Sequence, residues 1–215
     1  GEDFRQSLKL GSYDFGVICD YKCESITIIK NSGEKLSEFE YCALTSLIIM
    51  KSFPDADIYV SESAPESIEI MAKEYSARVH RTKVSPPYLM NELSKSNNKL
   101  FLHQFIYRFD AVGAIILLLD FLHTKNTTIE TLQSEIPLTH IVCTDISCKI
   151  DNQSKVLKEL CHKHNIEPEK AQDAIKVTFE NGWVLLVPKK ADSIINVISH
   201  SYSQEYAQEI SDIFT

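Results

Sequence analysis

The stretch Asp14-Phe-Gly-Val-Ile-Cys-Asp-Tyr-Lys-Cys-Glu-Ser-Ile-Thr-Ile-Ile-Lys-Asn-Ser-Gly33 decides how the fold of this chain is interpreted. Two apolar and partly β-branched runs, 15–19 and 25–29, predict two strands around a short polar turn. The Asn-Ser-Gly sequence that ends the stretch is typical of a second turn. Between the strands, Asp20 and Glu24 place two carboxylates at the end of a buried strand, where hard cations such as magnesium bind.

Lys22 lies midway between the two carboxylates. Its ammonium group competes with any cation for the same oxygens, which argues against a strong metal site. Two interpretations of Asp20 and Glu24 stay open. We favour carboxylates that cap the turn, and the alternative is a residual site for Mg²⁺.

Composition limits the function classes. The chain has 215 residues, of which 44% are hydrophobic and 24% are charged, which suits one large or two modest globular domains. Its net charge is −8 and it has no basic run, so we expect neither nucleic acid nor an anionic membrane as a partner. No apolar run reaches the roughly 18 residues of a membrane span, and no signal peptide is apparent. We therefore expect a cytoplasmic protein, and a first residue other than Met suggests part of a longer chain.

The cysteines show no Cys-x-x-Cys spacing, and two of them, Cys42 and Cys161, fall on apolar helix faces. We expect reduced, structural thiols, with disulfides or zinc as the alternatives. The six are Cys19, Cys23, Cys42, Cys143, Cys148 and Cys161.

Residues 13–124, after a polar tail at 1–12, alternate strand and helix patterns. This alternation predicts an α/β domain, a layered mixed sheet with helices on its faces. The helix at 110–123 is apolar nearly all round, so we expect it to be buried on most sides. The remaining predicted helices are 38–53, 65–75 and 86–93, and the remaining predicted strands are 57–61, 77–83 and 100–106.

Residues 125–215 follow a different pattern. Asn181-Gly182 between two apolar runs is a strong hairpin signal. The order of elements predicts a small α+β domain, an antiparallel sheet with helices on one side. The predicted helices are 129–135, 152–164 and 204–214, and the predicted strands are 140–147, 175–179, 183–187 and 194–199.

Five stretches carry a resemblance to a known family. They are Asp14 to Asp20 with Gly33 downstream, Arg81-Thr82-Lys83-Val84, Asp110-Ala111-Val112, Leu132 to Pro137, and Asn181 to Pro188. In this order and spacing, the set resembles the α-D-phosphohexomutase family, the phosphoglucomutase and phosphomannomutase relatives. The resemblance implies that 13–124 corresponds to the third domain of a four-domain enzyme and 125–215 to the fourth. A similar arrangement occurs where a sugar nucleotidyltransferase is fused ahead of mutase-like domains.

The departures from the family pattern fall on its functional loops. The family's metal loop reads Asp-x-Asp-x-Asp-Arg, and here Asp20, Lys22, Glu24 and Ser25 stand in those places. Its sugar-reading Gly-Glu-x-Ser-Gly-His is absent near 98–106, where only His103 is a candidate for contacting sugar. Its phosphate loop, Arg-Pro-Ser-Gly-Thr-Glu-Pro, is replaced at 187–193.

Lys189 and Lys190 are the candidates for binding phosphate in that replaced stretch. Phosphoryl transfer needs a metal to neutralise charge and donors that hold the far phosphate. We therefore expect a catalytically inactive descendant, a pseudoenzyme with no catalytic residues and no activity alone.

Such a chain would serve carbohydrate metabolism as a structural, oligomerising or sugar-phosphate-sensing module. Its expected partners are a sugar phosphate and the remaining domains of a longer chain. No cofactor is expected, with Mg²⁺ the candidate if a metal site survives. The enzymatic alternative is a working phosphohexomutase, an isomerase whose catalytic serine domain lies outside this chain. A third alternative is an interaction domain with no ligand.

Overall fold

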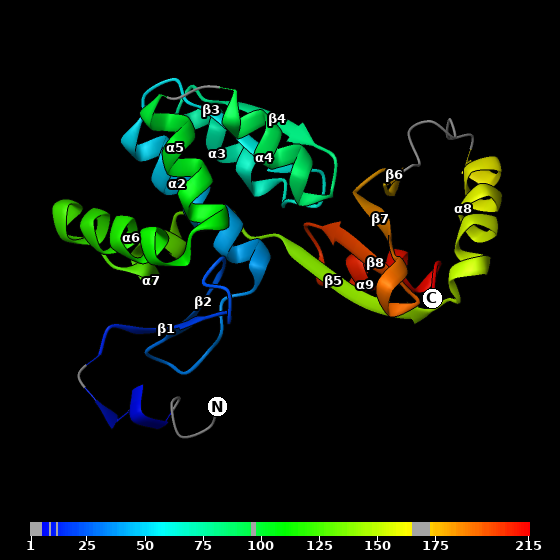
Figure 1. The fold of residues 1–215 in the computed structure, drawn as a ribbon, viewed down its shortest axis with the longest axis horizontal. Helices are drawn as coiled ribbons and strands as arrows, with labels where there is room; N and C mark the ends of the chain where they lie inside the picture. Colours follow the sequence, from blue (N-terminus) through cyan, green and yellow to red (C-terminus); the bar gives the residue numbers. More distant parts are fainter. Residues whose placement is uncertain (1–5, 9, 12, 96–97, 165–172) are drawn as a thin grey trace. The chain divides into compact units, whose positions relative to one another are not determined.

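A computed structural model describes residues 6–8, 10–11, 13–95, 98–164 and 173–215 (Figure 1). The chain forms two compact units. The first is built from residues of 1–60, 66–81 and 89–137, and the second from 61–65, 82–88 and 138–215. The predicted tail at 1–12 lies largely outside the described residues. The predicted domain boundary between 124 and 125 stays a prediction.

The first unit begins with the expected pair of strands. β1 (Phe15–Cys19) and β2 (Ile26–Lys30) pair antiparallel, from Phe15 opposite Lys30 to Cys19 opposite Ile26. Ile28 and Ile29 are each 1% exposed, so β2 is buried on both faces. The hairpin is drawn in blue in Figure 1.

Helix α2 (Glu38–Ser52) is the most thoroughly buried helix of this unit, because every residue from 42 to 50 is buried. Ser37 and Glu40 form a capping box at its start: the Ser37 hydroxyl accepts from the Glu40 N–H, and the Glu40 carboxylate from the Ser37 N–H. The hydroxyls of Thr45 and Ser46 donate to carbonyls one turn back, at 2.9 and 2.7 Å. These bonds allow polar residues to lie inside the core.

A strand–helix–strand unit follows α2. β3 (Asp57–Ser61), α3 (Ser67–Glu74) and β4 (Arg78–Thr82) are connected in that order. The Arg78 N–H donates to the carbonyl of residue 56, and the N–H of residue 62 donates to the Thr82 carbonyl. Both strands advance in the same direction between these two bonds, so the two-stranded sheet is parallel. The expected α/β character is confirmed.

The next segment corrects one prediction. α4 (Pro86–Ser94) is a helix as expected, but the predicted strand at 100–106 is wrong, because α5 (Lys99–Phe109) is a helix. The Asn98 side chain accepts a hydrogen bond from the Phe101 N–H at 3.0 Å and caps it. A short apolar run without clear alternation fits either structure, and the cap decides it.

Helix α6 (Ala111–Lys125) begins where expected, capped by the Asp110 side chain, but its predicted burial is wrong. Val112, Ile116 and Leu119 are 55%, 61% and 49% exposed. Their spacing places them on one helix face, and the opposite face is buried. α7 (Ile129–Ser134) follows, capped by Thr128.

The second unit contains a four-stranded antiparallel sheet in the order β5-β8-β7-β6. Its strands are β5 (His140–Ser147), β6 (Ile175–Phe179), β7 (Gly182–Lys189) and β8 (Ile194–Ser201), and its helices are α8 (Ile150–His164), the short η2 (Lys190–Asp192) and α9 (Gln204–Asp212). One face of the sheet packs in a core that includes Cys161 of α8 and Ile210 of α9. The predicted α+β arrangement is therefore confirmed.

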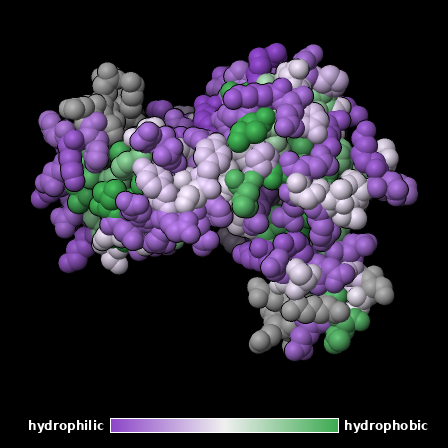
Figure 2. Space-filling view, turned by 180° about the vertical axis from the view of Figure 1, so that it is seen from behind, coloured by the Kyte–Doolittle hydropathy of each residue, from purple (hydrophilic) through white to green (hydrophobic). Residues whose placement is uncertain are grey.

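No helix among the described residues is long and apolar enough to cross a membrane. On the face shown in Figure 2, the described residues are mostly hydrophilic, and the apolar ones form small separate groups.

Candidate functional site

The loop that joins β1 and β2 contains the residues proposed as metal ligands. The Asp20 carboxylate accepts hydrogen bonds from the backbone N–H groups of Glu24 at 2.8 Å and Ser25 at 3.1 Å. The Cys23 N–H donates to the Asp20 carbonyl at 3.1 Å, and Cys23 adopts a left-handed conformation with φ of 55°. The side chain of Asp20 therefore closes the turn, as a capping aspartate does.

Glu24 contributes its backbone to this arrangement, and the residue itself is exposed. Lys22 holds its ammonium group 5.5 Å from the centre of the Tyr21 ring. Within the described residues, no three His, Cys, Asp or Glu side chains form a cluster that could hold a metal ion. Oδ1 of Asp20 already accepts both N–H groups, and a lysine lies in the same loop, so these residues do not supply the oxygen-rich coordination that magnesium takes.

The same loop is anchored to the start of α6. The carbonyl of Cys23 accepts a hydrogen bond from the Ala111 N–H at 2.9 Å. The Asp110 side chain accepts from the Gly113 N–H at 3.0 Å and so caps the same helix. Asp20 thus stabilises the β1–β2 loop, and Asp110 stabilises the start of α6, which contacts that loop. This geometry supports the structural interpretation of Asp20.

His103, the candidate sugar-binding residue, lies on α5 rather than on a strand. Its ring packs edge-to-face against Phe53, with ring centres 5.2 Å apart. Burial lowers its pKa, and the positive charge of Lys99 lowers it further. A half-buried ring that packs against an aromatic side chain is typical of a packing residue.

Lys189 and Lys190 lie where β7 turns into β8. The antiparallel pairing continues up to Lys189 opposite Ile194, so four residues, 190–193, make the connection. Lys189 is exposed, and the side chain of Lys190 lies outside the described part of the chain. Ser193 closes the turn with φ of 53°. A connection this short offers few backbone N–H groups to a phosphate.

The sequence-based candidates are therefore spread over separate elements. Asp20 and Glu24 share one loop, and His103 lies on a helix of the same unit. Lys189 and Lys190 belong to the second unit. The roles assigned to these residues stay predictions.

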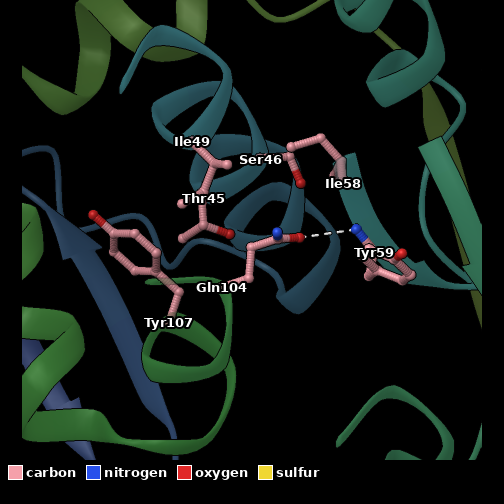
Figure 3. A pocket seen from close by; sticks show the side chains of 7 residues that line it. All are labelled: Thr45, Ser46, Ile49, Ile58, Tyr59, Gln104 and Tyr107. Atoms are coloured by element: carbon pink, nitrogen blue, oxygen red, sulfur yellow. Dashed lines mark hydrogen bonds between the residues drawn. The ribbon is translucent and has the colours of Figure 1, made fainter. Parts of the chain in front are cut away.

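A small pocket in the first unit involves residues that the sequence did not single out. Figure 3 shows its lining by α2, β3 and α5: Thr45, Ser46, Ile49, Ile58, Tyr59, Gln104 and Tyr107. The space available to the centre of a water molecule is about 10 Å³, roughly one water. It is too small for a sugar phosphate.

Gln104 beside this pocket makes two hydrogen bonds with β3. Its side-chain oxygen accepts from the Tyr59 N–H at 2.8 Å, and its side-chain nitrogen donates to the Asp57 carbonyl at 2.9 Å (Figure 3 draws the first). The amide thus satisfies the two backbone groups at the open edge of a two-stranded sheet. No sequence motif predicts these two hydrogen bonds, because the partners of Gln104 are 45 and 47 residues away in the sequence.

Among the residues that the structure describes, the carboxyl group with the most strongly shifted pKa is also on β3. Asp57 accepts hydrogen bonds from Arg78 at 2.8 and 2.9 Å and contacts the His80 ring at 2.8 Å. Arg78 and then His80 lower its pKa to about 2. The His80 ring stacks on Tyr59, with centres 4.7 Å apart. Alternate residues of two paired strands produce this cluster, which ties β3 to β4.

Comparison with known proteins supports a family relationship. No model of a protein family matches the chain. A phosphoglucosamine mutase from Methanococcus vannielii is 23% identical over 97% of this chain and 49% of its own length. A phosphoglucomutase/phosphomannomutase from Thermococcus kodakarensis is 21% identical over 98% of this chain and 48% of its own length.

Solved structures show the same fold. A phosphoglucomutase/phosphomannomutase family protein from Burkholderia thailandensis has a TM-score of 0.76 at 14% identity, and covers 99% of this chain and 48% of its own. An N-acetylphosphoglucosamine mutase from Aspergillus fumigatus, in complex with GlcNAc-6P and magnesium, has a TM-score of 0.59 at 10% identity. That match covers 97% of this chain and 51% of the mutase.

The fold defines a class first: one chain contains an α/β unit and a small α+β unit, and its fold is similar to that of the phosphohexomutase structures named above. Over nearly its whole length, the chain is similar in sequence and fold to the C-terminal half of the α-D-phosphohexomutases. It spans about half the length of the curated relatives that it matches.

Proposed function

We propose that this chain is a non-catalytic, structural part of a phosphohexomutase-like protein in carbohydrate metabolism. The observation that carries the proposal is the Asp20 turn. The two N–H groups from which Asp20 accepts hydrogen bonds belong to its own loop. In the same loop, Lys22 stands where the family pattern has a carboxylate. The side chain that would bind magnesium therefore holds the turn together.

The connection between β7 and β8 supports the same conclusion. Four residues join two fully paired strands at the place where the resemblance puts the phosphate-binding loop. In the described part of the chain, Lys189 is the cation there, and it is exposed. A single exposed ammonium group binds phosphate weakly, because water and salt screen it.

The enzymatic alternative rests on the relatives. The relatives are named as mutases, and each is about twice as long as the part that matches this chain. One similar structure contains both GlcNAc-6P and magnesium. On this alternative, the chain completes a mutase whose phosphate-transferring serine lies in a further domain. A third possibility is a sugar-phosphate sensor that binds the ligand without catalysis. This role requires Lys189 or Lys190 to contact phosphate.

The deciding experiment is a magnesium titration by calorimetry, followed by thermal unfolding with glucosamine 1-phosphate, glucose 1-phosphate or mannose 1-phosphate. We expect no magnesium binding at micromolar concentration and no shift of Tm with any sugar phosphate. A ligand at 100 times its Kd would stabilise the chain by about 2.7 kcal/mol.

Magnesium binding that Asp20→Ala abolishes would overturn the proposal in favour of the enzyme. A Tm shift that is lost in Lys189→Ala, but kept in the matched surface variant Lys158→Ala, would overturn it in favour of a sensor.

A further inference from the structure

We draw no further inference here: the strongest candidate, the exposed apolar face that Val112, Ile116 and Leu119 form on helix α6, carries none because nothing in the described part of the chain shows what covers it.

Discussion

The side chain of Gln104 accepts a hydrogen bond from the backbone N–H of Tyr59 at 2.8 Å, across 45 residues of sequence. With its second bond to the Asp57 carbonyl, it satisfies the edge of the parallel sheet from helix α5. Gln104 is 6% exposed, so water does not readily replace it. A buried backbone group that loses its partner costs about 1–3 kcal/mol.

We therefore expect Gln104→Leu, which keeps the size of the side chain, to lower the free energy of unfolding by about 2 kcal/mol or more. Leu102→Ala is the control, because Leu102 is on the same helix and 53% exposed, and it should cost about 0.5 kcal/mol or less. Urea unfolding measures both. Equal losses in the two variants would contradict the role of the amide.

The segment around Gln104 also shows where sequence reasoning failed. The sequence analysis predicts a strand at 100–106, but the apolar run there is short, and periodicity alone does not separate a buried strand from a helix. The signal that decides it is local: Asn98 stands three residues before Phe101, whose N–H it accepts. Asn before an apolar run is a helix start. The bonds from Gln104 to β3 had no comparable signal.

Elements with strong local chemistry were predicted well. The Asn181-Gly182 hairpin and the turn between β1 and β2 each depend on a few neighbouring residues. The predicted burial of α6 is too high, because burial depends on contacts with distant residues and not on local sequence signals. Composition gives hydrophobicity all round a helix, but which face is covered depends on tertiary contacts that the sequence does not contain.

The exposed face of α6 leads to a second prediction. Leu118 is 1% exposed and Ile116, two residues earlier, is 61% exposed. Removing buried methyl groups leaves a cavity, so we expect Leu118→Ala to destabilise the chain by about 3 kcal/mol. Ile116→Ala should cost less than about 1 kcal/mol. Thermal unfolding monitored by circular dichroism distinguishes the two, and a large cost at Ile116 would mean that its face is covered in solution.

The turn at Asp20 gives a third prediction. Asp20→Asn keeps an acceptor oxygen but removes the negative charge, and hydrogen bonds to an ionised acceptor are roughly twice as strong as neutral ones, so we expect the weaker bonds to the N–H groups of Glu24 and Ser25 to cost about 1 kcal/mol. The loss should be the same with and without magnesium. Glu24→Gln, which leaves the backbone bonds intact, is the control and should be nearly neutral. A magnesium-dependent difference between Asp20→Asn and wild type in urea unfolding would contradict the capping role.

Acid unfolding gives a fourth prediction. Hydrogen bonds from Arg78, and then His80, lower the pKa of Asp57 from 3.8 to about 2. A carboxyl group whose pKa is lower in the folded state stabilises the fold above the unfolded pKa. That stability disappears as the pH falls from about 4 towards 2. We expect Asp57→Asn to flatten the dependence of unfolding free energy on pH in this window.

Arg78→Gln tests the cause, because it removes the largest contribution and keeps His80. The Asp57 pKa, measured by NMR titration of its side chain, should rise towards its ordinary value in this variant. Its acid dependence should lie between those of wild type and Asp57→Asn. A wild-type Asp57 that titrates near 4 would rule out the ion pair as drawn by the structure.

The last prediction concerns Gly182, where β7 begins. A Cβ atom added there would overlap the backbone oxygen of His200 on β8 and press on the Ile210 side chain at 3.2 Å. The oxygen belongs to a strand paired on both sides, so it yields only if the sheet shifts. Overpacking of this kind costs about 1–3 kcal/mol, and we expect Gly182→Ala to fall at the upper end.

Asn181→Ala is the matched control for Gly182→Ala, because it is exposed and only its backbone oxygen is used, by the Ser201 hydroxyl at 2.8 Å. It should cost about 0.5 kcal/mol or less. The single tryptophan, Trp183, lies next to the site and reports unfolding by its fluorescence. If both variants unfold at the same urea concentration, β7 and β8 do not approach each other as closely at Gly182 as the structure shows. Glycine would then serve only the turn.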